Sequence, residues 1–196
     1  TLVIFMRMRR HYLNMMTEPD IAEGCKRHDP EARKALYECF AGCMMSLCLR
    51  YTGNREEAED LLHDGFLKAF NAIDMFTYRG EGSLGAWLRR IFTNQAISFL
   101  NARKHLVELT ESMTENISDE DETEPPALPA SIVTELIGTL PPGYRAVLNL
   151  YLIEGWSHRD IARCLNIRES TSASQYLRAR AALKKKIINY INTHDS

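Results

Sequence analysis

The chain has 196 residues, a length that fits one domain or two small ones. Apolar residues make up 45% of it, an ordinary share for a globular protein, and no stretch approaches the roughly 20 apolar residues of a membrane span. The net charge is only −2, but residues 106–139 hold nine acidic and no basic side chains, whereas residues 140–196 hold nine basic and four acidic ones. A basic end behind an acidic strip is typical of nucleic-acid binding at that end.

The first residues argue against export. A very short apolar run precedes the first arginines, which is the opposite order to a secretory signal. The five cysteines are an odd number and lack the density of a disulfide framework. We therefore expect a cytoplasmic protein without membrane insertion.

Helical periodicity recurs along the chain, while alternating runs rich in Val, Ile and Thr do not occur. The sequence therefore predicts an all-α fold. The expected helices cover residues 18–27, 30–51, 54–73, 83–104, 131–139, 142–153, 157–165 and 170–191, with ends accurate to a few residues.

The expected helix at 54–73 begins with acidic residues, which suit the positive end of a helix dipole. Its apolar residues can supply a core face, formed by Leu61, Leu62, Phe66, Ala69, Phe70 and Ile73. Asp60, His63 and Asp64 stand on a side that could meet a protein partner. Such a cluster is also compatible with a solvated face.

The stretch "YRGEGSLGAWLRRIFTNQAISFL" begins with a loop that contains two glycines and continues into the helix at 83–104. At about 100° per residue, an outer stripe falls within an arc of about 80°, and it contains Trp87, Arg90, Asn94, Ser98 and Asn101. Aromatic and amide groups beside a flexible loop suit single-stranded nucleic acid, whose bases can stack or bond through their edges. The alternative is that Trp87 and Tyr78 are packing residues.

The stretch "ESMTENISDEDETEPPALPA" is acidic, proline-rich and free of aromatic residues. It cannot bury enough apolar surface to offset its ordering entropy. We therefore expect a flexible linker between two helical modules.

The C-terminal module has the pattern of a helix-turn-helix, with a short helix, a tight turn and a longer basic helix. Ser157 and Asp160 have the spacing of a capping box. One face of the second helix could enter a major groove, and it carries Thr171, Ser174, Arg178 and Lys185, with Gln175 at its edge. A solvated basic helix in a helical hairpin is the alternative.

Other functional classes have little support. Cys39, Cys43 and Cys48 are close on one helix, as a metal or redox sensor would need, but a fourth ligand at zinc-site spacing is missing. The sequence also contains no P-loop, no G-x-S-x-G and no H-E-x-x-H motif. We therefore expect no catalytic residues, no metal and no cofactor.

Three stretches together resemble the extracytoplasmic-function (ECF) class of bacterial sigma-70-like factors: "AEDLLHDGFLKAF", "YRGEGSLGAWLRRIFTNQAI" and "LPPGYRAVLNLYLIEGWSHRDIARCLNIRESTSASQYLRARAALKKKI". The resemblance implies no enzyme activity and two small helical domains joined by the linker. These are a sigma-2-like domain at 16–105, an acidic linker at 106–130 and a sigma-4-like helix-turn-helix domain at 131–196. Residues 1–15 are then an extension that we expect to be disordered and dispensable.

The resemblance also implies partners and sites. Core RNA polymerase is expected to bind Asp60, His63, Asp64 and Phe66. The single-stranded −10 element is expected to contact Tyr78, Arg79, Gly80, Trp87, Arg90 and Asn94. The double-stranded −35 element is assigned to the helix-turn-helix residues Thr171, Ser174, Gln175, Arg178 and Lys185, and an anti-sigma factor is a further expected partner.

Some residues depart from the family pattern. His63 stands where glutamine is usual, and Ser170 and Ala173 replace the usual glycine and basic residue at the start of the recognition helix. The alternative function is a helix-turn-helix regulator that acts without core polymerase.

Overall fold

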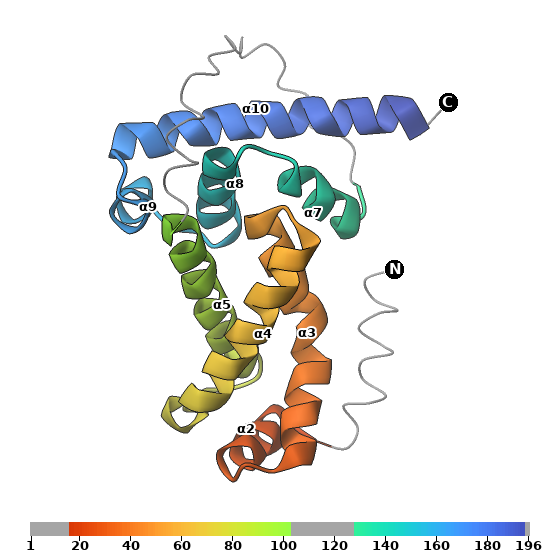
Figure 1. Cartoon of the computed structure of the whole chain (residues 1–196), viewed down its shortest axis with the longest axis vertical. Helices are drawn as coiled ribbons and strands as arrows, with labels where there is room; N and C mark the ends of the chain where they lie inside the picture. The colour runs from red at the N-terminus through yellow and green to blue at the C-terminus, as the bar shows by residue number, and fades with distance from the viewer. Residues whose placement is uncertain (1–15, 103–127, 195–196) are drawn as a thin grey trace. The chain divides into compact units, whose positions relative to one another are not determined.

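The computed structural model describes residues 16–102 and 128–194 (Figure 1). Among these residues it contains eight α-helices, one 3₁₀ helix and one π-helix, and no strand. The all-α prediction is therefore confirmed. The expected extension at 1–15 and most of the expected linker at 106–130 lie outside the described residues.

The helices of the N-terminal half are α2 (Glu18–Lys26), α3 (Pro30–Thr52), α4 (Arg55–Ala72), the 3₁₀ helix η1 (Ile73–Met75) and α5 (Ser83–Ala102). Those of the C-terminal half are α7 (Ala130–Gly138), α8 (Pro142–Leu148), the π-helix η3 (Asn149–Ile153), α9 (His158–Leu165) and α10 (Glu169–His194). The chain divides into two compact units. The described part of the first contains residues 16–47 and 59–95, and that of the second contains 48–58, 96–102 and 128–194.

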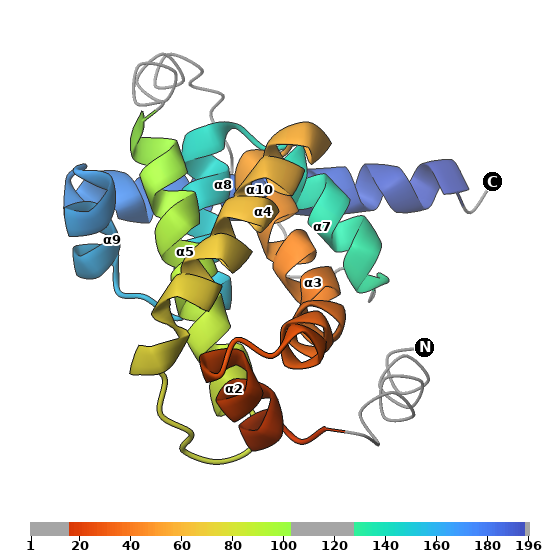
Figure 2. The same ribbon diagram turned by 60° about the horizontal axis from the view of Figure 1, so that its bottom comes forward.

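Within the first unit, α3, α4 and α5 lie side by side (Figures 1 and 2). Phe66 of α4 is 3% exposed and its ring lies 4.8 Å from that of Tyr37 and 5.2 Å from that of Phe92. Gly65 lets α4 and α5 approach each other, because a Cβ at this position would lie within 2.7 Å of three ring carbons of Phe92. The aromatic part of the core of the first unit therefore depends on a glycine at position 65.

Helix α2 begins at a capping box. The N–H of Asp20 donates to Oγ1 of Thr17, and the N–H of Thr17 donates to Oδ2 of Asp20 at 3.0 Å. The hydrogen bond from the Thr17 hydroxyl lowers the pKa of the Asp20 carboxyl. These bonds satisfy N–H groups that have no partner inside the helix, so the direction of the first turn of α2 is fixed.

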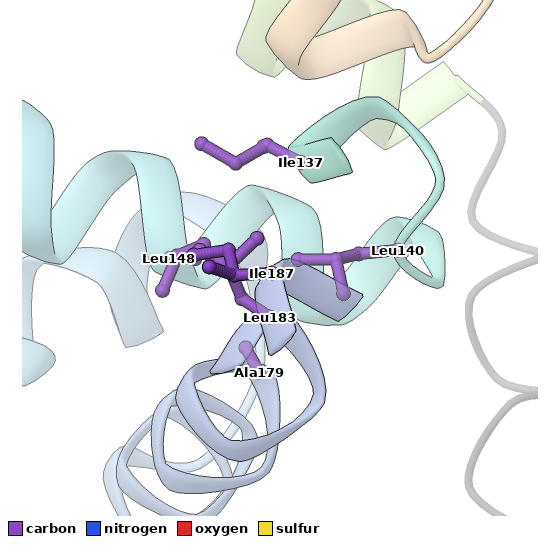
Figure 3. Close-up of a cluster of buried hydrophobic side chains, with 6 residues drawn as sticks. All are labelled: Ile137, Leu140, Leu148, Ala179, Leu183 and Ile187. Atoms are coloured by element: carbon purple, nitrogen blue, oxygen red, sulfur yellow. The ribbon is translucent and has the colours of Figure 1, made fainter. Parts of the chain in front are cut away.

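The core of the second unit forms where α10 crosses α7 and α8. Its buried side chains are Ile137, Leu140, Leu148, Ala179, Leu183 and Ile187 (Figure 3). The α10 residues among them recur at helical spacing and so form one stripe. This stripe fixes which side of α10 is left for other contacts.

A buried arginine joins two helix ends inside the second unit. The guanidinium of Arg145 donates to the carbonyl oxygens of Tyr51 and Thr52, at 3.0 and 2.7 Å. It also donates to the carbonyl oxygens of Gly138 and Leu140, at 2.6 and 3.3 Å. Arg145 is 8% exposed, and burial lowers the pKa of its guanidinium. One side chain thus donates hydrogen bonds to carbonyl groups at or just after the C-terminal ends of α3 and α7. Such carbonyl groups have no partner inside their own helix.

Candidate nucleic-acid and polymerase interfaces

The exposed face of α4 carries the residues expected to meet a protein partner. Asp60, His63 and Asp64 are all exposed. Leu67 is 49% exposed, and helical geometry puts it between His63 and Asp64 on the same face. Sequence reasoning missed Leu67, although its spacing of three and seven residues from Asp64 and Asp60 indicates this face. The α4 face, as we call Asp60, His63, Asp64 and Leu67, combines two carboxylates with an exposed apolar group.

Phe66, expected at the same partner site, lies on the other side of α4. It is 3% exposed and belongs to the aromatic core of the first unit. The interpretation of Phe66 as a core residue is confirmed. Its burial favours an indirect part in any partner contact, through the position of α4.

The glycine loop (residues 77–82) connects the end of η1 to α5. Tyr78 is 42% exposed and Arg79 is exposed. Gly80 and Gly82 have φ angles of 117° and 84°, which side chains other than glycine rarely adopt, and no atom approaches within 4 Å of a Cβ built at either position. The N–H of Arg79 donates to Oγ of Ser83 at 3.2 Å. The loop therefore has open space above its glycines beside an exposed aromatic ring.

The outer stripe of α5 is exposed at Arg90, Asn94 and Ser98, as expected, whereas Asn101 is half-buried and its Nδ2 donates to the carbonyl of Cys164 at 3.1 Å. Leu88 and Phe92 are fully buried, whereas Arg90 and Asn94 are exposed. Trp87 is half-buried, and its ring lies 5.3 Å from that of Phe76, which is itself 4% exposed. Trp87 thus takes part in packing at the start of the glycine loop while some of its surface remains accessible.

The helix-turn-helix has the expected local geometry. The N–H of Asp160 donates to Oγ of Ser157 at 3.2 Å, and this bond caps α9. Helix α9 is followed by Asn166, whose φ of 53° is the left-handed conformation typical of the residue that ends a helix. Ile161 and Leu165 are buried. The short helix is therefore fixed at both ends before α10 begins.

The residues expected to read the −35 duplex differ in accessibility. Lys185 is exposed, and Thr171, Ser174 and Arg178 are half-buried. Gln175 is only 8% exposed, which leaves little of its side chain for a base. On the inner side, Oγ of Ser172 lies 3.0 Å from Nδ1 of His158, so this part of α10 is held against the start of α9.

The cysteines of α3 do not share one environment. Cys48 is fully buried and Cys43 is exposed. Burial raises the pKa of the Cys48 thiol to about 12. Within residues 16–102 and 128–194, no three His, Cys, Asp or Glu side chains are grouped so that they could hold a metal ion. In the same described residues, no helix is both long enough and apolar enough to cross a membrane.

Comparison with known families matches both halves of the chain. Residues 36–105 match the family described as Sigma-70 region 2, and residues 130–183 match Sigma-70, region 4. The order of the two regions is the order of the two expected modules.

Similar proteins are named as sigma factors. The SigW ECF RNA polymerase sigma factor of Bacillus subtilis is 29% identical over 188 residues, which cover 89% of this chain and 98% of that protein. The sigma-E factor of Haemophilus influenzae is 27% identical over 184 residues, covering 88% and 96% of the two chains. Among solved structures, the sigma factor RpoE of Bartonella quintana in complex with the anti-sigma factor NepR is 20% identical, with a TM-score of 0.44, and the match covers 80% of this chain and 96% of that one.

The two family matches and the similar bacterial sigma factors define a bacterial transcription initiation factor built from sigma-70 regions 2 and 4. The chain belongs to the ECF class of the sigma-70 family. It is an alternative sigma factor, which directs RNA polymerase to promoters. The alternative of a regulator acting without core polymerase is not favoured, because region 2 precedes the helix-turn-helix.

Proposed function

We propose that three surfaces divide the work of promoter-directed initiation. The α4 face binds core RNA polymerase through Asp60, His63, Asp64 and Leu67. Phe66 packs in the core and so fixes the position of α4. In this proposal residues 16–105 serve polymerase and the −10 element, and residues 131–196 serve the −35 duplex.

The glycine loop and the outer stripe of α5 bind the melted −10 strand in this proposal. The supporting observation is the open, positive-φ glycine loop with its exposed Tyr78 ring, which leads into a helix whose outer face exposes Arg90 and Asn94. Unpaired bases can stack on such a ring, at about 1–3 kcal/mol per base. Intact duplex offers no free base face, so the surface acts after the strands separate.

The −35 duplex binds to α10 through Thr171, Ser174, Arg178 and Lys185, with the buried Gln175 contributing mainly to packing. The chain performs no catalysis of its own and works in the cytoplasm with the polymerase. An anti-sigma factor that blocks these surfaces is a further proposed partner, which affinity purification of the full chain from its own cells would test.

The central test is promoter opening. Tyr78→Ala and Asn94→Ala should lower open-complex formation on a duplex promoter, measured as permanganate reactivity of unpaired thymines, while −35 binding stays intact. A template melted in advance across the −10 region should recover part of the Tyr78→Ala defect, because the opening cost of a few kcal/mol is then already met.

The matched control is Tyr190→Ala, which removes an aromatic ring near the C-terminal end of α10. It should leave opening unchanged. If Tyr78→Ala and Asn94→Ala both open the duplex as well as the parent, the glycine loop does not capture the melted strand.

A further inference from the structure

The N-terminus of α5 lacks a capping side chain of its own. The carbonyl of Gly82 accepts the hydrogen bond of the Ala86 N–H at 3.0 Å, which makes Gly82 the residue before the helix. Ser, Thr, Asp or Asn at this position normally supplies an oxygen to the free N–H groups of the first turn. Gly82 has no such oxygen, and its φ of 84° explains why a glycine stands there.

Glu18 supplies the missing oxygen from another helix. The N–H of Gly82 and the N–H of Leu84 both donate to Oε2 of Glu18, at 3.1 and 3.4 Å. Residues 18 and 82 are 64 positions apart, and all three residues belong to the first unit. A carboxylate at a helix N-terminus is also favoured by the helix dipole. Glu18 therefore does for α5 what a capping residue normally does within its own helix.

Helix α2 contacts the other end of the loop as well. It packs against η1, the 3₁₀ helix that leads into the glycine loop, and Ile21 of α2 and Ile73 of η1 are both buried. The loop between α4 and α5 runs beside α2 in Figure 2. The Thr17 capping box fixes the first turn of α2, and Glu18 is the first residue of that turn. Both ends of the glycine loop are thus held by α2, which lies before the matched region 2 at 36–105.

We propose that Glu18 is a positioning residue that holds the glycine loop open for a base of the melted strand. This inference rests on the proposed function of the loop. The carboxylate fixes the main chain at Gly82 and Leu84, so that the loop keeps its backbone conformation without a base present. A loop fixed in advance loses less entropy when a base binds. The role of Glu18 is therefore in base capture and base selection, and it makes no contact with DNA itself.

The first test measures the clamp directly, by hydrogen exchange of the Gly82 and Leu84 amides in the full chain. Glu18→Ala should speed their exchange by about tenfold or more, because losing a hydrogen bond to a charged group makes opening of these amides easier by about that factor. Glu18→Gln keeps an acceptor oxygen without the charge and should have a smaller effect. The control Glu23→Ala removes another carboxylate of α2, one that pairs with Lys26, and should leave both amides unchanged.

The second test uses holoenzyme on promoters that differ only at the captured base. Glu18→Ala should reduce both opening and the preference between these promoters by several-fold, with −35 binding unchanged and Glu18→Gln in between. A variant that is merely less stable would lose activity equally on all of them. Thermal unfolding of each variant shows whether it is folded, and Glu18→Gln carries the test if Glu18→Ala is not.

The outcomes separate the two claims. Unchanged amide exchange in Glu18→Ala overturns the clamp, whatever the loop binds. Faster exchange with unchanged promoter preference, in an assay where Tyr78→Ala is defective, overturns the positioning role of Glu18 alone. If neither Glu18→Ala nor Tyr78→Ala affects opening, the proposed function of the glycine loop fails and the role of Glu18 fails with it.

Discussion

Buried thiols couple the stability of this protein to alkaline pH. Burial raises the pKa of the Cys48 thiol to about 12 and that of Cys25 to about 11, from an ordinary value of 9.0. At a pH between 9.0 and the folded-state pKa, each thiol keeps its proton in the folded chain and has lost it in the unfolded chain. The stabilising contribution is therefore complete below about pH 9 and is lost as the pH rises toward the folded-state values.

We expect the free energy of unfolding to fall above about pH 9, with each such thiol contributing up to roughly 1.4 kcal/mol per pH unit. Denaturant unfolding between pH 8 and pH 11 measures this slope. Cys48→Ala should flatten it, whereas Cys43→Ala should not, because Cys43 is exposed. Equal slopes for the parent and Cys48→Ala would contradict the assignment.

Arg178 and Arg180 provide a comparison on one helix. The two residues are two positions apart, so their side chains leave α10 in directions about 160° apart, and only one of them can face the duplex. Arg178→Ala should weaken −35 binding by about 1–3 kcal/mol and relax selectivity if Arg178 reads a base. Arg180→Ala should have a smaller, sequence-independent effect. Footprinting at fixed salt measures both, and an unchanged footprint for Arg178→Ala would remove it from the proposed contacts.

At the scale of elements, the approach of α4 to α5 depends on Gly65. A Cβ there would overlap the Phe92 ring, which is fully buried and cannot move aside freely. Gly65→Ala should lower the free energy of unfolding by about 1–3 kcal/mol through overpacking, although alanine is the better helix former.

The control is Asn71→Ala, at an exposed position of the same helix, which should change stability little. Thermal or denaturant unfolding distinguishes the two variants. If Gly65→Ala were neutral or stabilising, the Phe92 contact would not determine how α4 meets α5.

Apolar periodicity and capping residues predicted the elements well, because both are local. Each expected helix has an observed counterpart with ends within about three residues, except that the expected helix at 142–153 continues beyond Leu148 as the π-helix η3. The Nδ2 of Asn149, at the start of η3, donates to the carbonyl of Arg50, a contact between residues 99 positions apart. No local pattern contains that contact.

Site residues were predictable where helix phase alone decides their exposure. Phase correctly indicated that Asp64 and Asn94 are exposed. Phase also put Phe66 in the core, where the rings of Tyr37 and Phe92 pack against it, and its expected polymerase contact came from the family resemblance alone. The Glu18 contact was invisible in the sequence, because capping across helices leaves no spacing signal.

At the scale of the whole molecule, the first residues of the chain lie outside both matched regions. Residues 1–15 precede α2 and both matched regions. Deleting them should leave promoter-directed transcription within about twofold of the parent, because the proposed surfaces and the Thr17 capping box are retained. Run-off transcription with core polymerase measures this. Loss of transcription from a folded deletion variant would show that the segment takes part.

The acceptors of Arg145 have a consequence for how the protein responds to salt. All four of its described acceptors are main-chain carbonyl groups, which carry no net charge and do not titrate. Ions in solution weaken contacts between exposed charges strongly and buried contacts much less. Basic side chains on DNA phosphates lose affinity steeply as salt rises. Concentrated salt should therefore strip this protein from duplex DNA while the junction at Arg145 stays closed, so that release from DNA needs no loosening of the second unit.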